Sequence, residues 1–225
     1  MPDHYPQERR RVTIRWISAG GLLVAAALIV WWRAREPQQS IAAERPLSAE
    51  VSHAISGHKL KLENDEYVTY AGIRSVYQNE DAVLYDKALA RNAELVNAKE
   101  VRLRFDDADR DREGRWLGYV FVGDEFVNET LVREGLAYVR LTPQTRRFAE
   151  RLVQAQAEAQ RRKLGIWKEG IKSAGENYVG DPKYGDFHRQ GCEVMSQKPP
   201  ERLKTFASKT KAFQAGYAPC DKCRP

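Results

Sequence analysis

The chain has 225 residues and a net charge of +6, and 42% of its residues are hydrophobic. This composition excludes a wholly disordered or collagen-like chain and leaves room for one domain of typical size plus a smaller module. The basic excess lies outside residues 50–170, where 20 basic and 21 acidic side chains nearly cancel. A central domain that binds nucleic acid would therefore have to gather its arginines on one face.

An uncharged run of 17 residues, from Trp16 to Trp32, lies near the N-terminus. As a helix it would be about 26 Å long, close to the hydrocarbon thickness of a bilayer. We predict a transmembrane helix at 16–33, with tryptophans at both membrane interfaces. Four arginines precede the run and three follow it, which favours a cytoplasmic N-terminus at 1–15 and C-terminal domains outside, in the periplasm or the extracellular space.

The alternative for this run is a cleaved signal peptide. Such a peptide needs small residues directly after its apolar run, and Trp31-Trp32-Arg33 stands there instead. Residues 34–49 contain two prolines and two glutamines without an apolar period. Their composition predicts a linker between the membrane helix and the next domain.

Residues 50–169 alternate between strand-like and helix-like patterns of apolar residues. In chain order we expect strands at 51–62 and 67–73 joined by a turn at 63–66, a helix at 80–98, strands at 101–105 and 116–122, a short helix at 126–134, and a helix from Thr142 to 163. Thr142 would be the N-cap of the last helix, with Pro143 in its first turn. This order predicts an α+β domain around a small barrel.

Three stretches of this domain occur in a fixed order: GRWLGYV at 114–120, VNETLVREGLAYV at 127–139, and AQAEAQRRKLGIW at 155–167. Together they resemble the staphylococcal (thermo)nuclease family over residues 50–168. The resemblance implies a five-stranded OB-fold barrel with three helices. It also implies hydrolysis of DNA and RNA phosphodiesters with one Ca²⁺, held mainly by two aspartates, while a glutamate and two arginines assist at the phosphate.

Most of these family residues are replaced in this chain. Where the family has Asp-Gly-Asp-Thr, the chain has Ser56-Gly57-His58-Lys59. In the family's Arg-Leu-x-Gly-Ile-Asp-x-Pro-Glu segment, Thr69, Arg74 and Tyr77 stand at the positions of the phosphate arginine, the second metal aspartate and the glutamate. Only Arg115 fits the remaining arginine position, and a guanidinium can bind a phosphate without activating a water.

These replacements leave the domain poorly suited to Ca²⁺, which needs several oxygen ligands. Our first hypothesis is a membrane-anchored pseudo-nuclease, with no catalytic residue, that binds nucleic acid or a protein partner. The first alternative is a divergent metal-dependent nuclease that uses Arg115 and carboxylates between Asp106 and Glu113. The second alternative is an assembly scaffold.

The acidic run between Asp106 and Glu113 superficially resembles a calcium loop. The EF-hand pattern needs a glycine and a later glutamate, but Arg112 and Gly118 stand at those positions. We interpret the run as a solvated loop. We also expect His53 and His58 to be surface residues of a strand rather than metal ligands.

All three cysteines, Cys192, Cys220 and Cys223, lie in the last 34 residues. With His188 they form a His-x₃-Cys and a Cys-x₂-Cys pair, and zinc takes four such ligands in a tetrahedron. We therefore predict a structural zinc site in a zinc-knuckle domain at 181–225, after a linker at 170–180. The alternative is a disulfide, such as one between Cys220 and Cys223, which would leave one free thiol.

The tail is also similar to the metal-binding domain of the Ada DNA-repair protein, in Phe187-His188-Arg189 and in residues 215–223. That family commonly uses four cysteines, so His188 as the fourth ligand is our inference. The tail from residue 171 onward carries a net charge of +4. This charge is compatible with a nucleic-acid contact and with lysines that only confer solubility.

Overall fold

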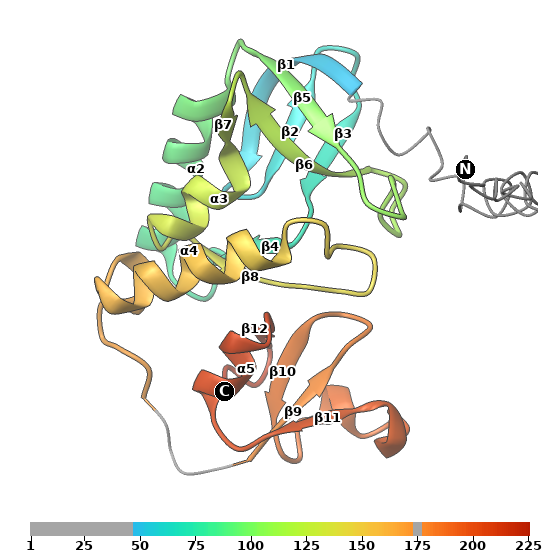
Figure 1. The fold of residues 1–225 in the computed structure, drawn as a ribbon, viewed down its shortest axis with the longest axis vertical. Helices are drawn as coiled ribbons and strands as arrows, with labels where there is room; N and C mark the ends of the chain where they lie inside the picture. Colours follow the sequence, from blue (N-terminus) through green and yellow to red (C-terminus); the bar gives the residue numbers. More distant parts are fainter. Residues whose placement is uncertain (1–46, 173–176) are drawn as a thin grey trace, which may run out of the picture. The chain divides into compact units, whose positions relative to one another are not determined.

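The computed structural model describes residues 47–172 and 177–225, which belong to one compact unit and are drawn in colour in Figure 1. The segment predicted at 1–15, the transmembrane helix predicted at 16–33, and nearly all of the linker predicted at 34–49 lie outside the described residues. Within the described residues, no helix combines the length and the apolar character that crossing a membrane requires.

Five strands close into a barrel. They are β1 (Leu47–Ser56), β2 (Lys59–Leu62), β3 (Tyr67–Tyr70), β5 (Glu100–Arg104) and β6 (Trp116–Val122). Neighbours pair antiparallel in the order β3-β2-β1-β5-β6, and a parallel pairing of β3 with β6 completes the ring. Alternate residues of β2, Leu60 and Leu62, point into the buried core. The predicted α+β fold with a five-stranded barrel is confirmed.

Three helices accompany the barrel, as expected. They are α2 (Ala82–Val96), α3 (Val127–Arg133) and α4 (Ala149–Arg161). The short strands are β4 (Ile73–Ser75), which pairs with β8 (Ala137–Val139), and β7 (Glu125–Phe126), which pairs with β6. Along α4, Leu152 and Ala155 belong to the barrel core, while Ala159 belongs to a second core. Helix α4 therefore joins the barrel to the C-terminal part of the chain (Figure 1).

The second core is that of a small C-terminal module, residues 177–225. Its sheet has the order β11-β9-β10-β12. The elements are β9 (Tyr178–Asp181), β10 (Asp186–Arg189), β11 (Lys204–Phe206), α5 (Lys209–Gln214) and β12 (Ala218–Pro219). Aromatic rings fill its centre, and Phe187 packs edge-on against both Tyr178 and Phe213.

The module packs directly against the barrel. The backbone N–H of Leu141 donates to the carbonyl oxygen of Gly216 at 2.7 Å. The side-chain amide of Gln156 donates to the backbone carbonyl oxygen of Phe213 at 3.1 Å. Tyr138 stacks on Phe213 with ring centroids 6.0 Å apart. A Cβ on Gly216 would lie 2.4 Å from the Leu141 side chain, so a larger residue there would push the two parts of the chain apart.

The strand predicted at 51–62 is in fact a hairpin. The chain turns at Gly57 and His58, and β1 pairs antiparallel with β2, Ser56 opposite Lys59. Gly57 lies against α2, where a Cβ would be 2.5 Å from that of Ala88. Only glycine fits this close approach, and the turn carries His58 into the interior rather than to the surface of a strand.

The prediction that the last helix begins at Thr142 and Pro143 is wrong. Helix α4 begins at Ala149. The hydroxyl of Thr142 instead accepts from the N–H of Gln144 at 3.3 Å, and the N–H of Thr142 donates to the hydroxyl of Thr145 at 2.9 Å. These bonds form a local turn that competes with a helix start.

Other boundaries shift by a few residues. Strand β1 begins at Leu47, inside the predicted linker, because Leu47 pairs with Leu103 of β5. Strand β9 begins at Tyr178, before the boundary predicted at 181. The strand predicted at 67–73 is divided at Gly72, whose φ of +74° is left-handed and favours glycine.

Candidate functional site

A cleft of about 940 Å³ lies between the barrel and the C-terminal module. His58, Thr69, Tyr77 and Arg115 line it on the barrel side. Turn residues Asp181–Tyr184 of the module and its segment Lys198–Leu203 line it as well. The structure therefore brings together four of the five positions singled out by the family resemblance. Residues of the C-terminal module form the opposite wall of the cleft.

Arg74, the fifth position, is 2% exposed and is not among the residues that line the cleft. Its guanidinium donates to both carboxylate oxygens of Glu80, at 2.7 and 3.3 Å, and to the carbonyl oxygen of Pro219 at 2.9 Å. The guanidinium carbon lies 4.8 Å from the ring centroid of Tyr77 and 5.2 Å from that of Tyr138. Arg74 is thus a fixed internal cation.

The charge of Arg74 is well stabilised. Burial alone would lower the pKa of Arg74, but the hydrogen bonds and charge of Glu80 outweigh burial and raise it. Because Arg74 is buried and the Glu80 side chain is only 12% exposed, solvent ions screen the pair weakly. The pair is a structural element rather than a ligand site.

His58 is also buried, contrary to the expectation of a surface residue. Its Nδ1 lies 2.7 Å from the hydroxyl of Ser75 and accepts from the backbone N–H of Ser75 at 3.3 Å. Because a backbone N–H can only donate, Nδ1 is unprotonated and the ring is neutral. Burial, followed by the positive charges of Lys59 and Arg74, holds the pKa of His58 well below its usual range.

This environment predicts acid sensitivity. Protonation of His58 is favoured in the unfolded chain over the folded one, so stability should fall as pH drops below about 6.5, by at most about 1.4 kcal/mol per pH unit. Four cations face the ring: Lys59, Arg74, Arg140 and Arg115. Urea unfolding at several values between about pH 5 and pH 8 measures the slope of the free energy of unfolding against pH. His58→Gln should remove it, and exposed His53→Gln should keep it; an equal slope in both variants would contradict this account.

Arg115, the predicted phosphate contact, lines the cleft but already has two acidic partners. Its Nε donates to Asp111 at 2.7 Å, and its Nη2 donates to Glu113 at 2.8 Å. Thr69 donates to the same Asp111 oxygen that Arg115 contacts, at 2.9 Å. Burial would raise the pKa of Asp111, but the hydrogen bonds from Arg115 and Thr69 lower it. Arg115 is therefore held in place by carboxylates that partly neutralise it.

Lys59 is the barrel cation best prepared for an external anion. It is partly buried at the edge of the cleft. Burial, followed by the charge of Arg115, lowers its pKa. No hydrogen bond or ion pair of its ammonium group is found among residues 47–172 and 177–225. An anion bound in the cleft would offset both the cost of burying this ammonium group and its repulsion by Arg115.

The acidic run before Arg115 does not form a carboxylate cluster. The carboxylate of Asp106 accepts from the backbone N–H groups of Arg146 and Arg147, each at 2.6 Å. Asp106 therefore holds the loop that leads to α4. Over the part of the chain that is described, the one group of three or more potential metal ligands is not in this run but in the C-terminal module.

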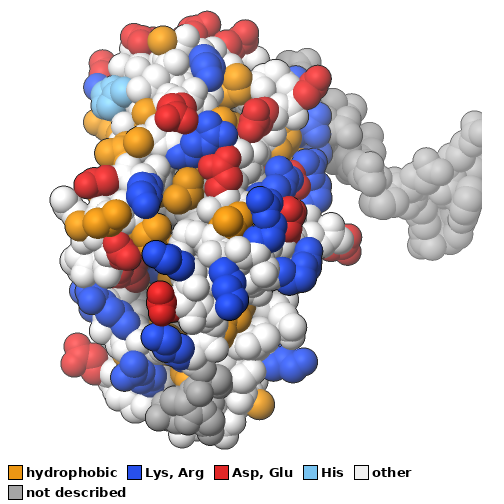
Figure 2. Space-filling model, turned by 90° about the vertical axis from the view of Figure 1, so that its left-hand side faces the viewer, with side chains coloured by type: hydrophobic (Ala, Val, Ile, Leu, Met, Phe, Trp, Pro, Cys, Tyr) orange, Lys and Arg blue, Asp and Glu red, His pale blue; other side chains and the backbone are white. Residues whose placement is uncertain are grey.

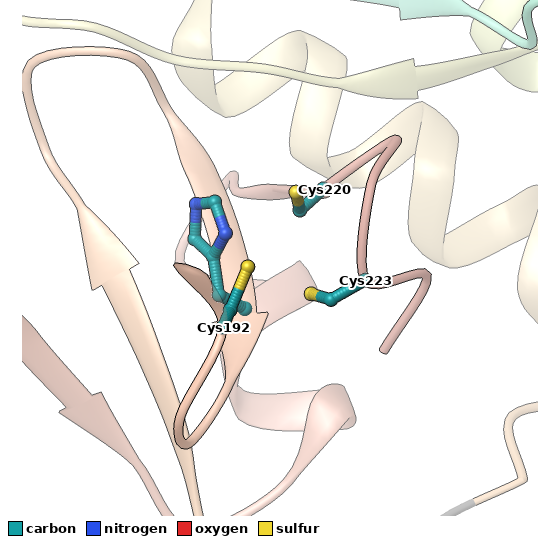
Figure 3. A group of neighbouring side chains, drawn as sticks. Cys192, Cys220 and Cys223 are labelled. Atoms are coloured by element: carbon teal, nitrogen blue, oxygen red, sulfur yellow. The ribbon is translucent and has the colours of Figure 1, made fainter. Parts of the chain in front are cut away.

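That group is the predicted set His188, Cys192, Cys220 and Cys223, whose ligand atoms lie within 4.8 Å of one another. The three sulfur atoms point toward a common centre (Figure 3). His188 lies on β10 and Cys192 on the turn after it, while Cys220 and Cys223 follow β12. The parallel pairing of β10 with β12 brings the two halves together.

The residues fit a tetrahedral metal ion. Nδ1 of His188 is buried and has no hydrogen-bond partner in the described parts of the chain. A buried nitrogen without a partner is costly unless it has a ligand to bind. None of the three cysteines forms a disulfide. The cluster is therefore a potential metal site of the soft and borderline type that zinc uses.

The charge distribution distinguishes the cleft from the helical side of the molecule. On the side where α2, α3 and α4 lie, basic and acidic side chains are interspersed (Figure 2), and Arg91, for example, pairs with Glu134 at 2.9 Å. In the cleft, eight basic residues face three acidic ones. The basic residues are Lys59, Arg110, Arg112, Arg115 and Arg140 from the barrel, and Lys183, Lys198 and Arg202 from the module.

Several functional residues were not singled out from the sequence. Glu80, the partner of Arg74, stands in a polar stretch before α2, and nothing in its spacing marks it. Asp186 pairs with Arg140 at 2.7 Å across the contact between barrel and module. The ring of Tyr184 lies close to Arg112 of the barrel and Lys198 of the module. The barrel partners of Asp186 and Tyr184 are distant in the chain, and Glu80 follows Arg74 without any periodic pattern that marks the pair.

Comparison with known proteins agrees with this fold. The family profile described as "Staphylococcal nuclease homologue" matches residues 72–169. The thermonuclease of Staphylococcus intermedius is 32% identical over 165 residues, which cover 68% of this chain and 98% of the relative. The thermonuclease of Staphylococcus hyicus is 45% identical over 73 residues, 32% of this chain and 43% of the relative.

A third relative, the SPbeta prophage-derived endonuclease YokF of Bacillus subtilis (strain 168), is 41% identical over 132 residues, 57% of this chain and 40% of the relative. The chain thus spans nearly all of the first relative and about two fifths of the other two. The closed barrel, the three helices and these similarities lead to one conclusion: the chain belongs to the staphylococcal nuclease family.

Proposed function

We propose that this protein is a catalytically impaired member of the staphylococcal nuclease family that binds nucleic acid in its basic cleft without hydrolysing it. Residues 16–33 would anchor it in a membrane, with the barrel and the C-terminal module on the outer side. Zinc on His188, Cys192, Cys220 and Cys223 would stabilise the module.

The observation that carries the proposal is the position of Arg74. A Ca²⁺ ion bound as the resemblance implies would lie beside a guanidinium that Glu80 and Pro219 hold in place. Because two like charges repel strongly in a buried site, and Ca²⁺ needs several oxygen ligands, the residues present do not fit this ion. His58, the replacement for the other aspartate ligand, offers a nitrogen that Ser75 already engages.

The divergent-nuclease alternative would need carboxylates that converge in the cleft. Within residues 47–172 and 177–225, the carboxylates that line it are those of Asp111, Glu113 and Asp181. The first two bind Arg115, and Asp181 pairs with Lys198 at 3.3 Å. Each acid is therefore neutralised by a neighbouring cation, which disfavours a second cation such as a metal ion. The relatives' names support this alternative, since they describe nucleases.

Binding of nucleic acid is supported by the excess of positive charge in the cleft. A cleft lined mainly by one sign of charge concentrates ligands of the other sign, and phosphate contacts dominate the affinity of proteins for nucleic acids. The ammonium group of Lys59 in particular forms no ion pair among the described residues, although the charges of Asp111 and Glu113 act on it. The near-neutral central segment thus gathers part of its basic residues at one place, as the sequence argument required.

Zinc is supported by the chemistry of the donor set. Three thiols and one imidazole can complete a tetrahedron, and a site with four protein ligands leaves no position for a reacting water. Zinc in this site would therefore act structurally. A module of about 50 residues buries little apolar surface, so a metal site would supply part of its folding free energy.

The test combines cleavage and binding in the same samples of the full chain. Fluorescein-labelled single-stranded DNA and RNA are titrated with the protein with and without Ca²⁺, and S. intermedius thermonuclease serves as the active control. We expect binding that weakens with salt, and intact oligonucleotide at every Ca²⁺ concentration. Ca²⁺-dependent cleavage by this chain would refute the impaired-enzyme proposal, and absence of binding would point instead to a protein partner or a scaffold role.

A matched pair of variants locates the binding. Lys59→Ala should weaken binding of the oligonucleotide about tenfold, because a hydrogen bond to a charged group contributes about 1.5 kcal/mol. Lys61→Ala, on the same strand, is the control, since Lys61 pairs with Asp65 at 2.6 Å and lies outside the cleft. Fluorescence anisotropy gives both dissociation constants. Equal losses in the two variants would place the nucleic acid elsewhere.

A further inference from the structure

We propose that the C-terminal module is itself part of the nucleic-acid site. Its turn at Asp181–Gly185 and its segment Lys198–Leu203 form a second wall that binds phosphates of a single strand through Lys183 and Arg202. This inference rests on the proposed function and adds to it, because the family profile ends at residue 169. The second wall is therefore a feature of this chain outside the matched region.

The first support is the concentration of cations around Tyr184. The guanidinium carbon of Arg112 lies 4.2 Å from its ring centroid, and the ammonium groups of Lys198 and Lys183 lie at 4.4 and 5.8 Å. Arg112 comes from the barrel, so both walls contribute. A hydrogen bond from Arg112 and these charges lower the pKa of Tyr184, which indicates a positive local potential.

The second support is that two cations of this wall lack acidic partners. Lys198 pairs with Asp181 at 3.3 Å. By contrast, no ion pair or hydrogen bond of the Lys183 ammonium or of the Arg202 guanidinium is found within the described residues. With Lys59 on the barrel, the cleft thus has three uncommitted cations on its two walls. Repeated phosphates along one strand would satisfy such an arrangement.

The third support is that the wall is held firmly. The N–H of Lys183 donates to the carboxylate of Asp181 at 2.9 Å, which fixes the turn. Asp186, just after the turn, pairs with Arg140 of the barrel at 2.7 Å. A Cβ on Gly185 would lie 2.5 Å from the carbonyl oxygen of Leu141, so the backbones touch here. The cleft is preorganised, which limits the entropic cost of binding.

The size of the cleft selects a single strand. Clefts of roughly 300–1,000 Å³ enclose ligands the size of a drug molecule, so a volume of about 940 Å³ holds only a few nucleotides. A base-paired duplex is far wider than such a ligand. The module, lying opposite the barrel wall, would exclude a duplex while admitting one unpaired strand.

The test compares two double variants of the full chain with the same charge change. Lys183→Ala/Arg202→Ala removes the uncommitted cations of the wall. Lys204→Ala/Lys211→Ala removes two exposed cations of the same module that do not line the cleft. Anisotropy with a fluorescein-labelled single-stranded DNA oligonucleotide, over a series of salt concentrations, gives the dissociation constant and its salt dependence. Circular dichroism and zinc content confirm that each variant is folded.

We expect the first variant to bind at least about tenfold more weakly, and the slope of log affinity against log salt to fall by about 1.4, or about 0.7 for each lost phosphate contact on a single strand. The control should change less than about twofold, and a blunt duplex should compete poorly.

If Lys59→Ala weakens binding while Lys183→Ala/Arg202→Ala does not, the strand lies on the barrel alone, and the inference fails although the proposed function stands. Equal competition by the duplex would overturn the selection of a single strand. A wild-type protein that binds no oligonucleotide would refute both the inference and the proposed function.

Discussion

Removal of zinc should unfold the C-terminal module while the barrel keeps its structure. Structural zinc sites bind with apparent free energies of about 10–16 kcal/mol in peptides near neutral pH, more than the core of a small module supplies. Cys192 and Cys220 are buried with His188, so without an ion the thiols and the imidazole would be crowded and poorly satisfied. We therefore expect one zinc per chain and loss of amide protection throughout 178–220 after chelation.

Elemental analysis and hydrogen exchange with mass spectrometry measure these two quantities. Cys220→Ser should reproduce the effect of chelation, because it removes one of four ligands. Lys222→Ala is the matched control, since Lys222 lies between two ligands but is exposed and pairs only with Asp221, at 3.9 Å. A module that keeps its protection in a strong chelator, or that carries a disulfide between Cys220 and Cys223 when purified without reductant, would rule out the zinc proposal.

Arg74→Met should destabilise the protein by about 3–5 kcal/mol, because it removes one partner of a buried ion pair. The carboxylate of Glu80, whose side chain is 12% exposed, would lose both charged hydrogen bonds, and the carbonyl oxygen of Pro219 would lose its donor. Equilibrium unfolding in urea gives the loss of free energy. The effect is large because the remaining charge cannot be hydrated without disrupting the core.

The control for Arg74 is a pair of the same chemistry on the surface. Arg91 and Glu134 are 34% and 37% exposed, so Arg91→Met should cost no more than about 1 kcal/mol. A second variant, Arg74→Met/Glu80→Met, should recover most of the loss, since no buried charge is left alone. If Arg74→Met were as mild as Arg91→Met, the buried ion pair would not stabilise the fold as described.

Arg74 also connects the barrel with the four-residue cluster around His188. Its acceptor, the carbonyl oxygen of Pro219, directly precedes Cys220, and Arg224 donates to the carbonyl oxygen of Asn79 at 2.7 Å. The chain after β12 is thus held by the barrel on one side and by the ligand cluster on the other. Arg74 is therefore a structural link between the barrel and the C-terminal module.

Much of the barrel could be predicted from the sequence. Strands β5 and β6 and helices α2 and α3 lie within a few residues of their predicted positions, because each has a clear apolar period and is bounded by polar residues. The errors lie in the turns. Gly57 reverses the chain where the alternation continues unbroken, and the bonds between Thr142 and Thr145 imitate a helix start without continuing as one.

The sequence could indicate which residues belong to the candidate site, but not which contacts surround them. The motif positions predicted that His58 and Arg74 replace family residues and that Arg115 retains one, and the ligand spacing identified the cluster around His188. The environments of His58 and Arg74 depend on contacts with more distant segments of the chain. The buried state of His58 follows from the close approach of Gly57 to α2, and the neutralisation of Arg115 follows from the path of the loop that carries Asp111.

By itself, the sequence determined the fold family and the four-residue cluster in the tail, because these depend on residue type and spacing alone. It also predicted the loss of the family's acidic metal ligands. Only the tertiary structure decided that Arg74 donates to the carbonyl oxygen of Pro219, and that the tail folds back to form a wall of the cleft. Both features are contacts between segments far apart in the chain, formed when the aromatic core of the module packs against α4, and such contacts leave no periodic signal in the sequence.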